Sequence, residues 1–206
     1  MPVGQYLLAA KDHLVIPEHP YPVKAVTRSK TIDFCLMRCA GDTILHAVEA
    51  KWIGKEPRST LVDEIFDDLY RLAILDWPQA ERCQRWLLVA GVKKHVQDAI
   101  FKREINAGNG RKSAFGEIFA EIIGKPYRHR IYTIQGKPRL PHAQKWKVAA
   151  ESLNKDALAN GITSTLCGKA ISDSGAQYCC YVWRIALPQG CGYRTFNQLF
   201  PALAVG

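Results

Sequence analysis

A continuous apolar run over residues 84–92 constrains the fold more than any other feature of this chain. Its sequence, QRWLLVAGV, has the length of a strand and carries no polar side chain after Arg85. A strand of this kind is usually buried on both faces, in the middle of a sheet that other layers cover. The run therefore predicts an α/β protein with a central sheet.

Two strands and a helix are expected before this run. Residues 30–39 and 43–52 are rich in β-branched and apolar residues, and the short turn at Ala40–Asp42 makes these two strands antiparallel. Residues 60–75 place apolar side chains at helical spacing after a capping Ser59 or Thr60. This pattern predicts a helix with one buried face.

The N-terminal segment is expected to add a helix and a further strand. Residues 4–15 can form a short amphipathic helix, and another strand is expected around Val23–Val26. Between the two, prolines predict an extended, turn-rich connection, at Pro17, Pro20 and Pro22. The segment has neither the basic nor the long apolar region of a signal peptide.

The rest of the chain predicts a mixture of helices and strands. Helices are expected over 94–105, 114–123 and 145–158, strands over 127–135 and 178–187, and a loop over 107–112. No linker or repeat divides the sequence, so residues 1–206 are expected to form a single domain. Within it, residues 1–101 form a core and residues 102–206 an α+β C-terminal extension packed on that core.

Positive charge is concentrated in the second half of the chain. The net charge is +9, yet residues 1–101 carry 13 basic and 13 acidic side chains, while residues 102–206 carry 15 and 6. Such a block suits a polyanionic partner such as nucleic acid, although a basic face can also serve solubility alone. The candidate phosphate contacts are Arg111, Lys112, Arg128, Arg130, Lys137, Arg139, Lys145 and Lys147.

Cysteine usage and hydropathy indicate a cytoplasmic protein. The seven cysteines are odd in number, lie partly within apolar runs and show no C-x-x-C spacing, which favours reduced, buried thiols over a zinc site. No apolar run approaches the roughly 20 residues that a membrane span requires. We therefore expect no membrane partner.

A charged constellation interrupts the two apolar strands. Glu49 and Lys51 lie two apart on a predicted strand, so their side chains point to the same side. Asp33 lies within the preceding strand and can approach Glu49 across the pair. Two carboxylates beside a lysine are unfavourable for stability alone, but they suit a hard divalent cation such as Mg²⁺ or Mn²⁺.

These residues resemble the motif of the PD-(D/E)xK nuclease superfamily. Asp33 is followed by Glu49-x-Lys51 on the next strand, and then by a helix and a buried strand. The resemblance covers about residues 5–92 and implies a restriction-endonuclease-like core of helix, three antiparallel-type strands, helix and strand, with a mixed central sheet. It implies that Asp33, Glu49 and the Ala50 carbonyl bind the metal and that Lys51 is the catalytic lysine.

The sequence also departs from that family. Thr31-Ile32 stands where a proline often precedes the first acid. Many members carry a glutamate in the first helix, where this chain offers only Gln5 and Asp12, with Glu18 beyond it. A second metal site is therefore left open, and these three residues, together with Arg71, are accessory candidates.

Other conspicuous residues are expected to have structural roles. Four acids of helix 60–75 indicate a solvated face: Asp63, Glu64, Asp67 and Asp68. Arg71 either pairs with Asp67 one turn away, which we favour, or reaches the candidate site. The tryptophans are expected in the core rather than as base-stacking platforms: Trp52, Trp77, Trp86, Trp146 and Trp183.

The function expected from these patterns is Mg²⁺-dependent endonuclease activity. The enzyme would hydrolyse phosphodiester bonds in nucleic acid, with DNA as the expected substrate. A non-catalytic member of the same fold that binds nucleic acid or a protein partner is the first alternative. An unrelated α/β protein with Glu49 and Lys51 at its surface is the second. A homodimer is left open because no dimer face can be identified.

Overall fold

The computed structural model describes eleven elements of secondary structure. The described residues are 13–20, 31–38, 44–58, 60–74, 83–106, 111–113, 115, 118–119, 121–130, 161–172 and 177–186. The strands are β1 (His13–Pro20), β2 (Thr31–Arg38), β3 (Ile44–Ile53), β4 (Gln84–Val92), β5 (Glu104–Asn106), β6 (Arg111–Ser113), β7 (Pro126–Arg130), β8 (Gly161–Ile171) and β9 (Tyr178–Ala186). The helices are α2 (Leu61–Ile74) and α3 (Lys93–Ile100).

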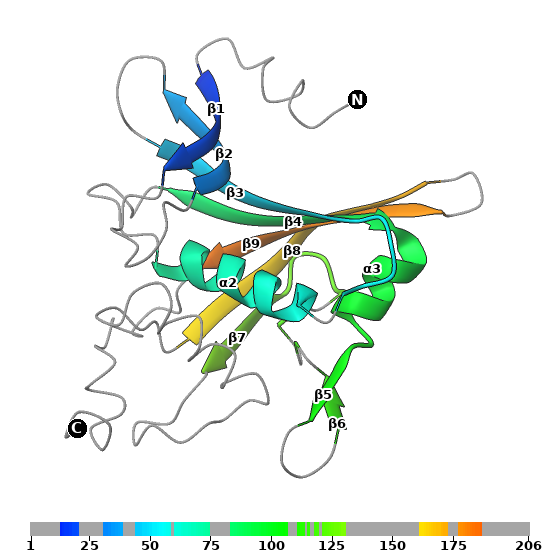
Figure 1. The fold of residues 1–206 in the computed structure, drawn as a ribbon. Helices are drawn as coiled ribbons and strands as arrows, with labels where there is room; N and C mark the ends of the chain where they lie inside the picture. The colour runs from blue at the N-terminus through cyan, green and yellow to red at the C-terminus, as the bar shows by residue number, and fades with distance from the viewer. Residues whose placement is uncertain are drawn as a thin grey trace, which may run out of the picture.

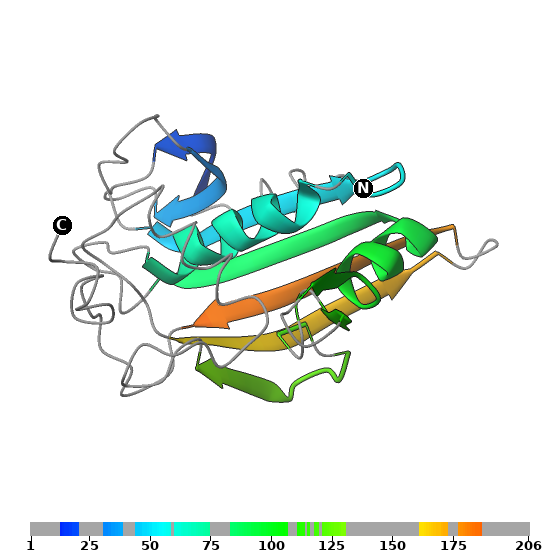
Figure 2. The ribbon, with the colours of Figure 1, turned by 60° about the horizontal axis from the view of Figure 1, so that its bottom comes forward.

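A seven-stranded mixed sheet organises the protein. Its strand order is β1-β2-β3-β4-β9-β8-β7, while β5 and β6 form a separate two-stranded sheet. Strands β3 and β4 run parallel and are joined by a crossover through α2, whereas the other ladders described in this sheet are antiparallel. Both helices cover the same face of the sheet (Figures 1 and 2). The chain is therefore a mixed α/β protein, as the sequence predicts.

The expected central strand is β4, with the predicted bounds. Leu87 and Val89 are fully buried on the face that the helices cover, whereas Trp86, Leu88 and Ala90 on the other face are half-buried. Burying a leucine or valine side chain stabilises a fold by about 1.5–3 kcal/mol. The strand is thus central in the sheet but fully buried on only one of its faces.

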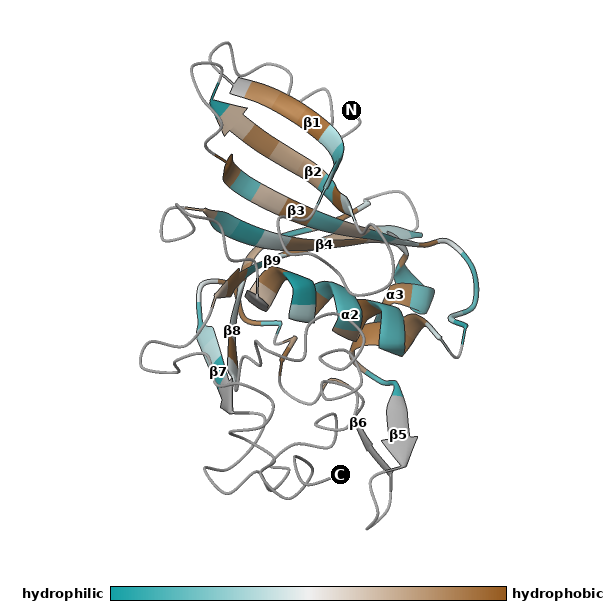
Figure 3. Cartoon of the chain, turned by 60° about the vertical axis from the view of Figure 1, so that its left-hand side comes forward, coloured by the Kyte–Doolittle hydropathy of each residue, from teal (hydrophilic) through white to brown (hydrophobic). Residues whose placement is uncertain are grey.

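Helix α2 packs through one apolar side. Val62, Ile65, Leu69 and Leu72 are buried at helical spacing. Asp63 and Glu64 lie in the first turn, where the helix dipole favours negative charge. Figure 3 shows hydrophobic and hydrophilic segments alternating along this helix. In the residues that the structure describes, no helix is long and apolar enough to cross a membrane.

An aromatic cluster attaches Phe115 and Phe119 to the sheet. Trp183 on β9 lies 4.8 Å from the ring of Phe119 and 5.3 Å from that of Tyr181. Phe115 in turn stacks on Phe66 of α2, at 5.1 Å between ring centroids. These rings are buried or nearly so, and the cluster joins the helix, the loop and β9 into one core.

Several sequence-based element predictions are wrong. The helix expected over 4–15 is wrong at residues 13–15, which belong to β1. Residues 4–12 lie outside the described part of the chain. The expected connection at Pro17 and Pro20 is also strand, and β1 tolerates these prolines because it is an edge strand. The helix expected over 94–105 ends at Ile100, and residues 104–106 form β5.

The helix expected over 114–123 is not formed by the described residues. Phe115, Ile118 and Phe119 lie in a turn, with an Ile118 N–H donating to the Phe115 carbonyl, and Ile123 forms an isolated bridge with Leu166. The spacing of Phe115, Ile118 and Phe119 predicts a helix, but their side chains instead fill the aromatic core. Strand β8 was not predicted at all, because its buried Ser164 and Thr165 hide its apolar pattern.

The basic half of the chain extends the central sheet. Residues 102–206 were expected to pack on the core, but β9 pairs directly with β4, and β8 and β7 follow it in the same sheet. The strand expected over 127–135 is present as β7 over 126–130. Three other expectations lie outside the described residues: the strand around Val23–Val26, the turn at 40–42 and the helix over 145–158.

The close approach of β3 and β4 gives a test of this arrangement. Gly91 has a φ of +153°, and a Cβ atom there would lie 2.2 Å from the Ile53 carbonyl oxygen. We expect Gly91→Ala to lower the free energy of unfolding by at least about 1–3 kcal/mol, since neither strand can move without breaking the ladder.

Gly168→Ala is the matched control, measured by urea unfolding of both variants. A Cβ atom at this β8 position lies 3.9 Å from Val182 and causes no clash. Equal stability of the two variants would contradict the described pairing of β3 with β4.

Candidate active site

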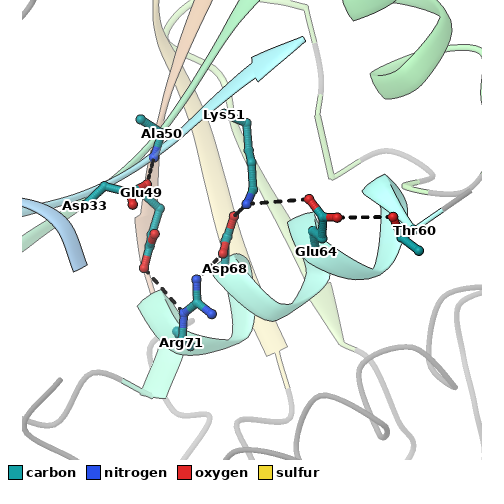
Figure 4. Close-up of polar contacts among 8 residues, drawn as sticks. All are labelled: Asp33, Glu49, Ala50, Lys51, Thr60, Glu64, Asp68 and Arg71. Atoms are coloured by element: carbon teal, nitrogen blue, oxygen red, sulfur yellow. Dashed lines mark hydrogen bonds and ion pairs between the residues drawn. The ribbon is translucent and has the colours of Figure 1, made fainter. Parts of the chain in front are cut away.

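Strand register brings the two candidate acids together. The β2–β3 ladder pairs Phe34 with Val48 and Cys35 with Ala47. Continued by one residue, it places Asp33 across from Glu49. The Ala50 N–H donates a hydrogen bond of 2.7 Å to Asp33 Oδ2 (Figure 4). Asp33 and Glu49 therefore lie on adjacent strands, across from each other, with the Asp33 carboxylate bonded to the residue after Glu49.

Glu49 points from β3 towards α2. Its side chain is 1% exposed, and its Oε1 lies 3.4 Å from Arg71 Nε on the helix. Nearby, Cys35 has a pKa raised to about 12, first by burial and then by the charges of Cys83 and Glu49. Glu49 is thus a buried carboxylate held by a guanidinium, in a setting that suppresses thiol ionisation.

Lys51 lies on the same side of β3 and contacts the same helix. Its Nζ lies 3.0 Å from Asp68 Oδ2 and 3.9 Å from Glu64 Oε2. Asp68 also bonds to the Arg71 Nη2 group, and Glu64 accepts a hydrogen bond of 3.1 Å from Thr60 Oγ1. Figure 4 shows the resulting chain of polar contacts from Glu49 through Arg71 and Asp68 to Lys51.

Two periodicities produce this chain of contacts. Strand alternation puts Glu49 and Lys51 on one side of β3. Helical spacing puts Glu64, Asp68 and Arg71 on one stripe of α2, at successive separations of four and three residues. The stripe faces the strand because the apolar residues beside it are buried. Lys51 therefore meets two carboxylates of the helix, whereas Arg71 meets Glu49 on the strand and Asp68 on its own helix.

Burial and charge act in opposite directions on these groups. Burial alone would lower the pKa of Lys51, but the carboxylates of Asp68, Glu64 and Asp33 outweigh it and raise that pKa. Burial also raises the pKa of Asp68, against the opposing effect of Arg71 and Lys51. The lysine is therefore firmly protonated at neutral pH.

Carboxylates outnumber cations in the cluster. Among the side chains drawn in Figure 4, two cations face four carboxylates, namely Lys51 and Arg71 against Asp33, Glu49, Glu64 and Asp68. Like charges at such separations repel in a medium less polar than water. Among these described side chains, the carboxylates therefore exceed the cations that pair with them.

The donor chemistry fits a magnesium ion with few protein ligands. In the described part of the chain, no three side chains of histidine, cysteine, aspartate or glutamate gather in a way that could hold a metal. Mg²⁺ often binds through one or two carboxylates and keeps several waters. Asp33 and Glu49 supply two hard oxygen donors, so they fit this ion but not a closed four-ligand zinc site.

The helix contributes two residues whose part in the site the sequence leaves open, Asp68 and Arg71. Asp68 was expected on a solvated face but is almost fully buried, because it lies beside Leu69 at the margin of the apolar stripe. Arg71 enters the site, which was the less favoured of its two alternatives. The signal available in the sequence was an acid and a base three residues apart beside buried leucines.

The accessory candidates divide between described and undescribed residues. Glu18 lies in β1 across from Asp33, between the pairs Pro17–Phe34 and His19–Ile32, and its φ of 51° is rare for a residue other than glycine. Gln5 and Asp12 lie outside the described residues. Among these three residues, Glu18 is therefore the accessory candidate whose position the structure describes, and its side chain is exposed.

Of the candidate phosphate contacts, Arg128 is the one whose side chain the structure describes, and it lies away from this site. Arg128 lies on β7, at the sheet edge opposite β1, and its side chain is exposed. Arg111 and Lys112 lie on β6 and Arg130 on β7, with side chains outside the described set. The remaining four also lie outside it: Lys137, Arg139, Lys145 and Lys147.

The described cysteines and tryptophans agree with expectation in part. Cys35, Cys83, Cys167, Cys179 and Cys180 carry free thiols, and three of them are buried. Trp183 is fully buried and Trp86 is half-buried, donating a 2.9 Å hydrogen bond to His46 Nδ1. Trp52 contradicts the expected core position, because its side chain is 68% exposed.

Removal of the buried guanidinium should destabilise the protein. We expect Arg71→Met to lower the free energy of unfolding by about 3–5 kcal/mol, because it takes a cation from beside two buried carboxylates. Lys102→Met is the control: its 3.3 Å ion pair with Asp98 is exposed and is worth about 1 kcal/mol or less. Similar losses in the two variants, measured by urea unfolding, would contradict the buried network.

The raised pKa of Lys51 should be visible in the pH dependence of stability. A lysine whose folded-state pKa is raised contributes stability that is complete below its unfolded value and is lost as pH rises through the folded value. We expect the unfolding free energy of the wild type to fall from about pH 10.5 upwards more steeply than that of Lys51→Met. Parallel profiles would show that Lys51 has no such partners, and Lys102→Met should follow the wild type.

Comparisons with known proteins do not assign this geometry to a family. No family model, no curated protein and no solved structure matches the chain. The site is accordingly characterised by its own residues: a carboxylate pair on β2 and β3, a protonated lysine beside it, and a helix that supplies the balancing acid and guanidinium.

Proposed function

We propose that this chain is a metal-dependent nuclease of the PD-(D/E)xK type. The observation that carries the proposal is the meeting of Asp33 and Glu49 from adjacent strands beside Lys51. Phosphodiester hydrolysis needs a site for a divalent cation, an activated water and a positive side chain near the phosphate. These three residues can supply the cation site and the positive side chain.

The order of the elements supports the same proposal. Three antiparallel strands are followed by α2 and then by β4, parallel to β3. Asp33 lies on the second strand and Glu49 and Lys51 lie on the third. This order supports the proposal for the part of the resemblance that follows its first helix. The resemblance covers about residues 5–92; of its expected first helix, residues 13–15 form β1 and the rest lies outside the described residues.

Asp33 and Glu49 would hold a Mg²⁺ or Mn²⁺ ion. The Ala50 carbonyl is the proposed third ligand, because the N–H and C=O groups of one strand residue point to the same side and the Ala50 N–H points to Asp33. When bound, the ion lowers the pKa of a coordinated water and neutralises charge on the scissile phosphate.

The remaining residues of the cluster would position these groups. Lys51, kept protonated by Asp68 and Glu64, would donate hydrogen bonds to the phosphate or orient the attacking water. Arg71 holds Glu49 and Asp68 at fixed positions while the ion is absent. Because it also competes for Glu49, its contact should loosen when a cation binds.

Nucleic acid is the substrate that the charge distribution supports, and DNA is the one proposed first. The chain carries a net charge of +9, all of it contributed by residues 102–206, whereas the cluster itself is acidic. Basic residues outside the acidic site would attract the phosphate backbone, while a metal ion bound in the site would supply the chemistry of cleavage.

A non-catalytic binding protein of the same fold is the second candidate. The observation that favours it is that Lys51 and Glu49 already have partners of opposite charge, so the cluster is partly neutralised by its own residues. Such a protein would bind nucleic acid or a protein partner without hydrolysis.

Cleavage of plasmid and linear DNA and of RNA, with Mg²⁺ or Mn²⁺ and against EDTA, tests the proposal. We expect metal-dependent cleavage that falls on the order of 10²-fold or more in Asp33→Asn and Lys51→Ala, because each removes a group that stabilises charge in the transition state. Lys102→Ala is the control and should retain the wild-type rate.

A thermal unfolding series with Mg²⁺ gives a second readout. Binding to the folded state raises the melting temperature, and we expect this rise in the wild type but not in Asp33→Asn. Salt-sensitive nucleic-acid binding without cleavage by either metal would instead support the non-catalytic candidate.

A further inference from the structure

An exposed aromatic pair lies at the end of the strand that carries Lys51. Trp52 on β3 is 68% exposed and Tyr178 on β9 is 49% exposed. Their rings are stacked, with 6.2 Å between centroids and 24° between planes. The pair forms across β4, which separates the two strands, with Trp52 beside Ala90 and Val92 beside Tyr178. A tryptophan that is expected in the core thus presents its ring to the surface.

A cavity of about 510 Å³ adjoins this ring. Its lining includes Trp52, Gly54, Lys55, Arg58, Leu61 and Glu64. Glu64 is also the ion-pair partner of Lys51, at 3.9 Å. The cavity and the candidate active site therefore share Glu64, which lines the one and pairs with Lys51 in the other.

The position of the Trp52 indole is defined by the loop that follows β3. A Cβ atom on Gly54 would lie 2.6 Å from the indole Nε1, so the ring rests against this glycine. A side chain at position 54 would displace the ring. Gly54 leaves room for the indole, and the Tyr178 ring stacks on it. These two contacts define the position of the indole beside the cavity.

The chemistry of this surface matches an unpaired nucleobase. A flat aromatic face binds a base by stacking whatever its sequence, and Lys55 and Arg58 are exposed cations that suit the adjoining phosphates. Bases within a duplex are stacked on their neighbours and cannot offer a free face to a protein ring. A single strand, a loop or an extruded base can do so.

We infer that Trp52 is a base-stacking platform that selects nucleic acid with unpaired bases next to the site of cleavage. This inference rests on the proposed nuclease function and names its substrate class. The base would stack on the indole, and the phosphates beside it would contact Lys55 and Arg58, which line the same cavity as Glu64. Tyr178 and Gly54 act as positioning residues because they hold the ring.

Binding measured in EDTA separates this platform from catalysis. The probes are a fluorescein-labelled single-stranded oligodeoxynucleotide, the same strand in a duplex, and a strand of equal length whose central nucleotides lack bases. Fluorescence anisotropy gives the dissociation constants. For the wild type, we expect the single strand to bind more tightly than the base-free strand, which has the same phosphate charge.

Variants at position 52 distinguish an aromatic face from mere bulk. Stacking of one base on an aromatic side chain contributes about 1–3 kcal/mol, so Trp52→Leu should weaken single-strand binding by about 5-fold to 150-fold. Trp52→Phe should retain most of the affinity, and Gly54→Ala should weaken it by displacing the ring. Duplex and base-free binding should change less than twofold in all three variants.

The outcomes separate the platform from the nuclease. Equal single-strand affinity of the wild type and Trp52→Leu overturns the platform, even if Mg²⁺-dependent cleavage is intact. Trp52-dependent binding without cleavage of any substrate overturns the nuclease and leaves the platform standing. A wild-type dimer that Trp52→Leu dissociates in sedimentation would show that a second copy covers this surface, which also overturns the platform.

Discussion

A buried guanidinium connects the two elements on which the site depends. Arg71 lies between Glu49 on β3 and Asp68 on its own helix, and Asp68 in turn holds Lys51. Charges removed from water attract each other strongly but lose their hydration, so such a network adds little net stability compared with an apolar contact. Its main consequence is geometric. It specifies which side of α2 faces β3, and with that the spacing between the lysine and the acid pair.

The two sides of β3 have different chemical characters, and the strand end joins them. Glu49 and Lys51 face the helix, whereas Trp52 belongs to the alternate side and is left outside the core. The loop after β3 returns to α2 through Gly54, Lys55 and Arg58, and this return places the exposed ring and two cations at the rim of a cavity that Glu64 also lines. Side chains alternate between the two sides of a strand. On β3, this alternation places the polar cluster at Glu49 and Lys51 within three residues of the exposed ring of Trp52.

The sequence predicted the parts of this arrangement that depend on local patterns. The bounds of β2, β3, α2 and β4 follow from alternation and helical spacing, and the register that aligns Asp33 with Glu49 follows from a short connection. The burial of Asp68 could not be predicted, because the face of a helix that meets a sheet is decided by tertiary packing. The exposure of Trp52 and the presence of β8 were not predicted for the same reason. Hydropathy alone does not show which apolar residue lies at a strand end. It also does not show which strand with polar residues lies inside a sheet. The gathering of the basic residues stays a prediction, since most of them lie outside the described part of the chain.

The strand order has a consequence for how the chain is made. The last strand along the described chain, β9, lies between β4 and β8 in the sheet. During synthesis on the ribosome, β4 therefore has one unpaired edge until residue 186 has emerged. An unpaired apolar strand edge can pair with other chains and seed aggregates. The nascent protein should accordingly depend on chaperones that shield such an edge, even though every residue of the acidic cluster is translated long before.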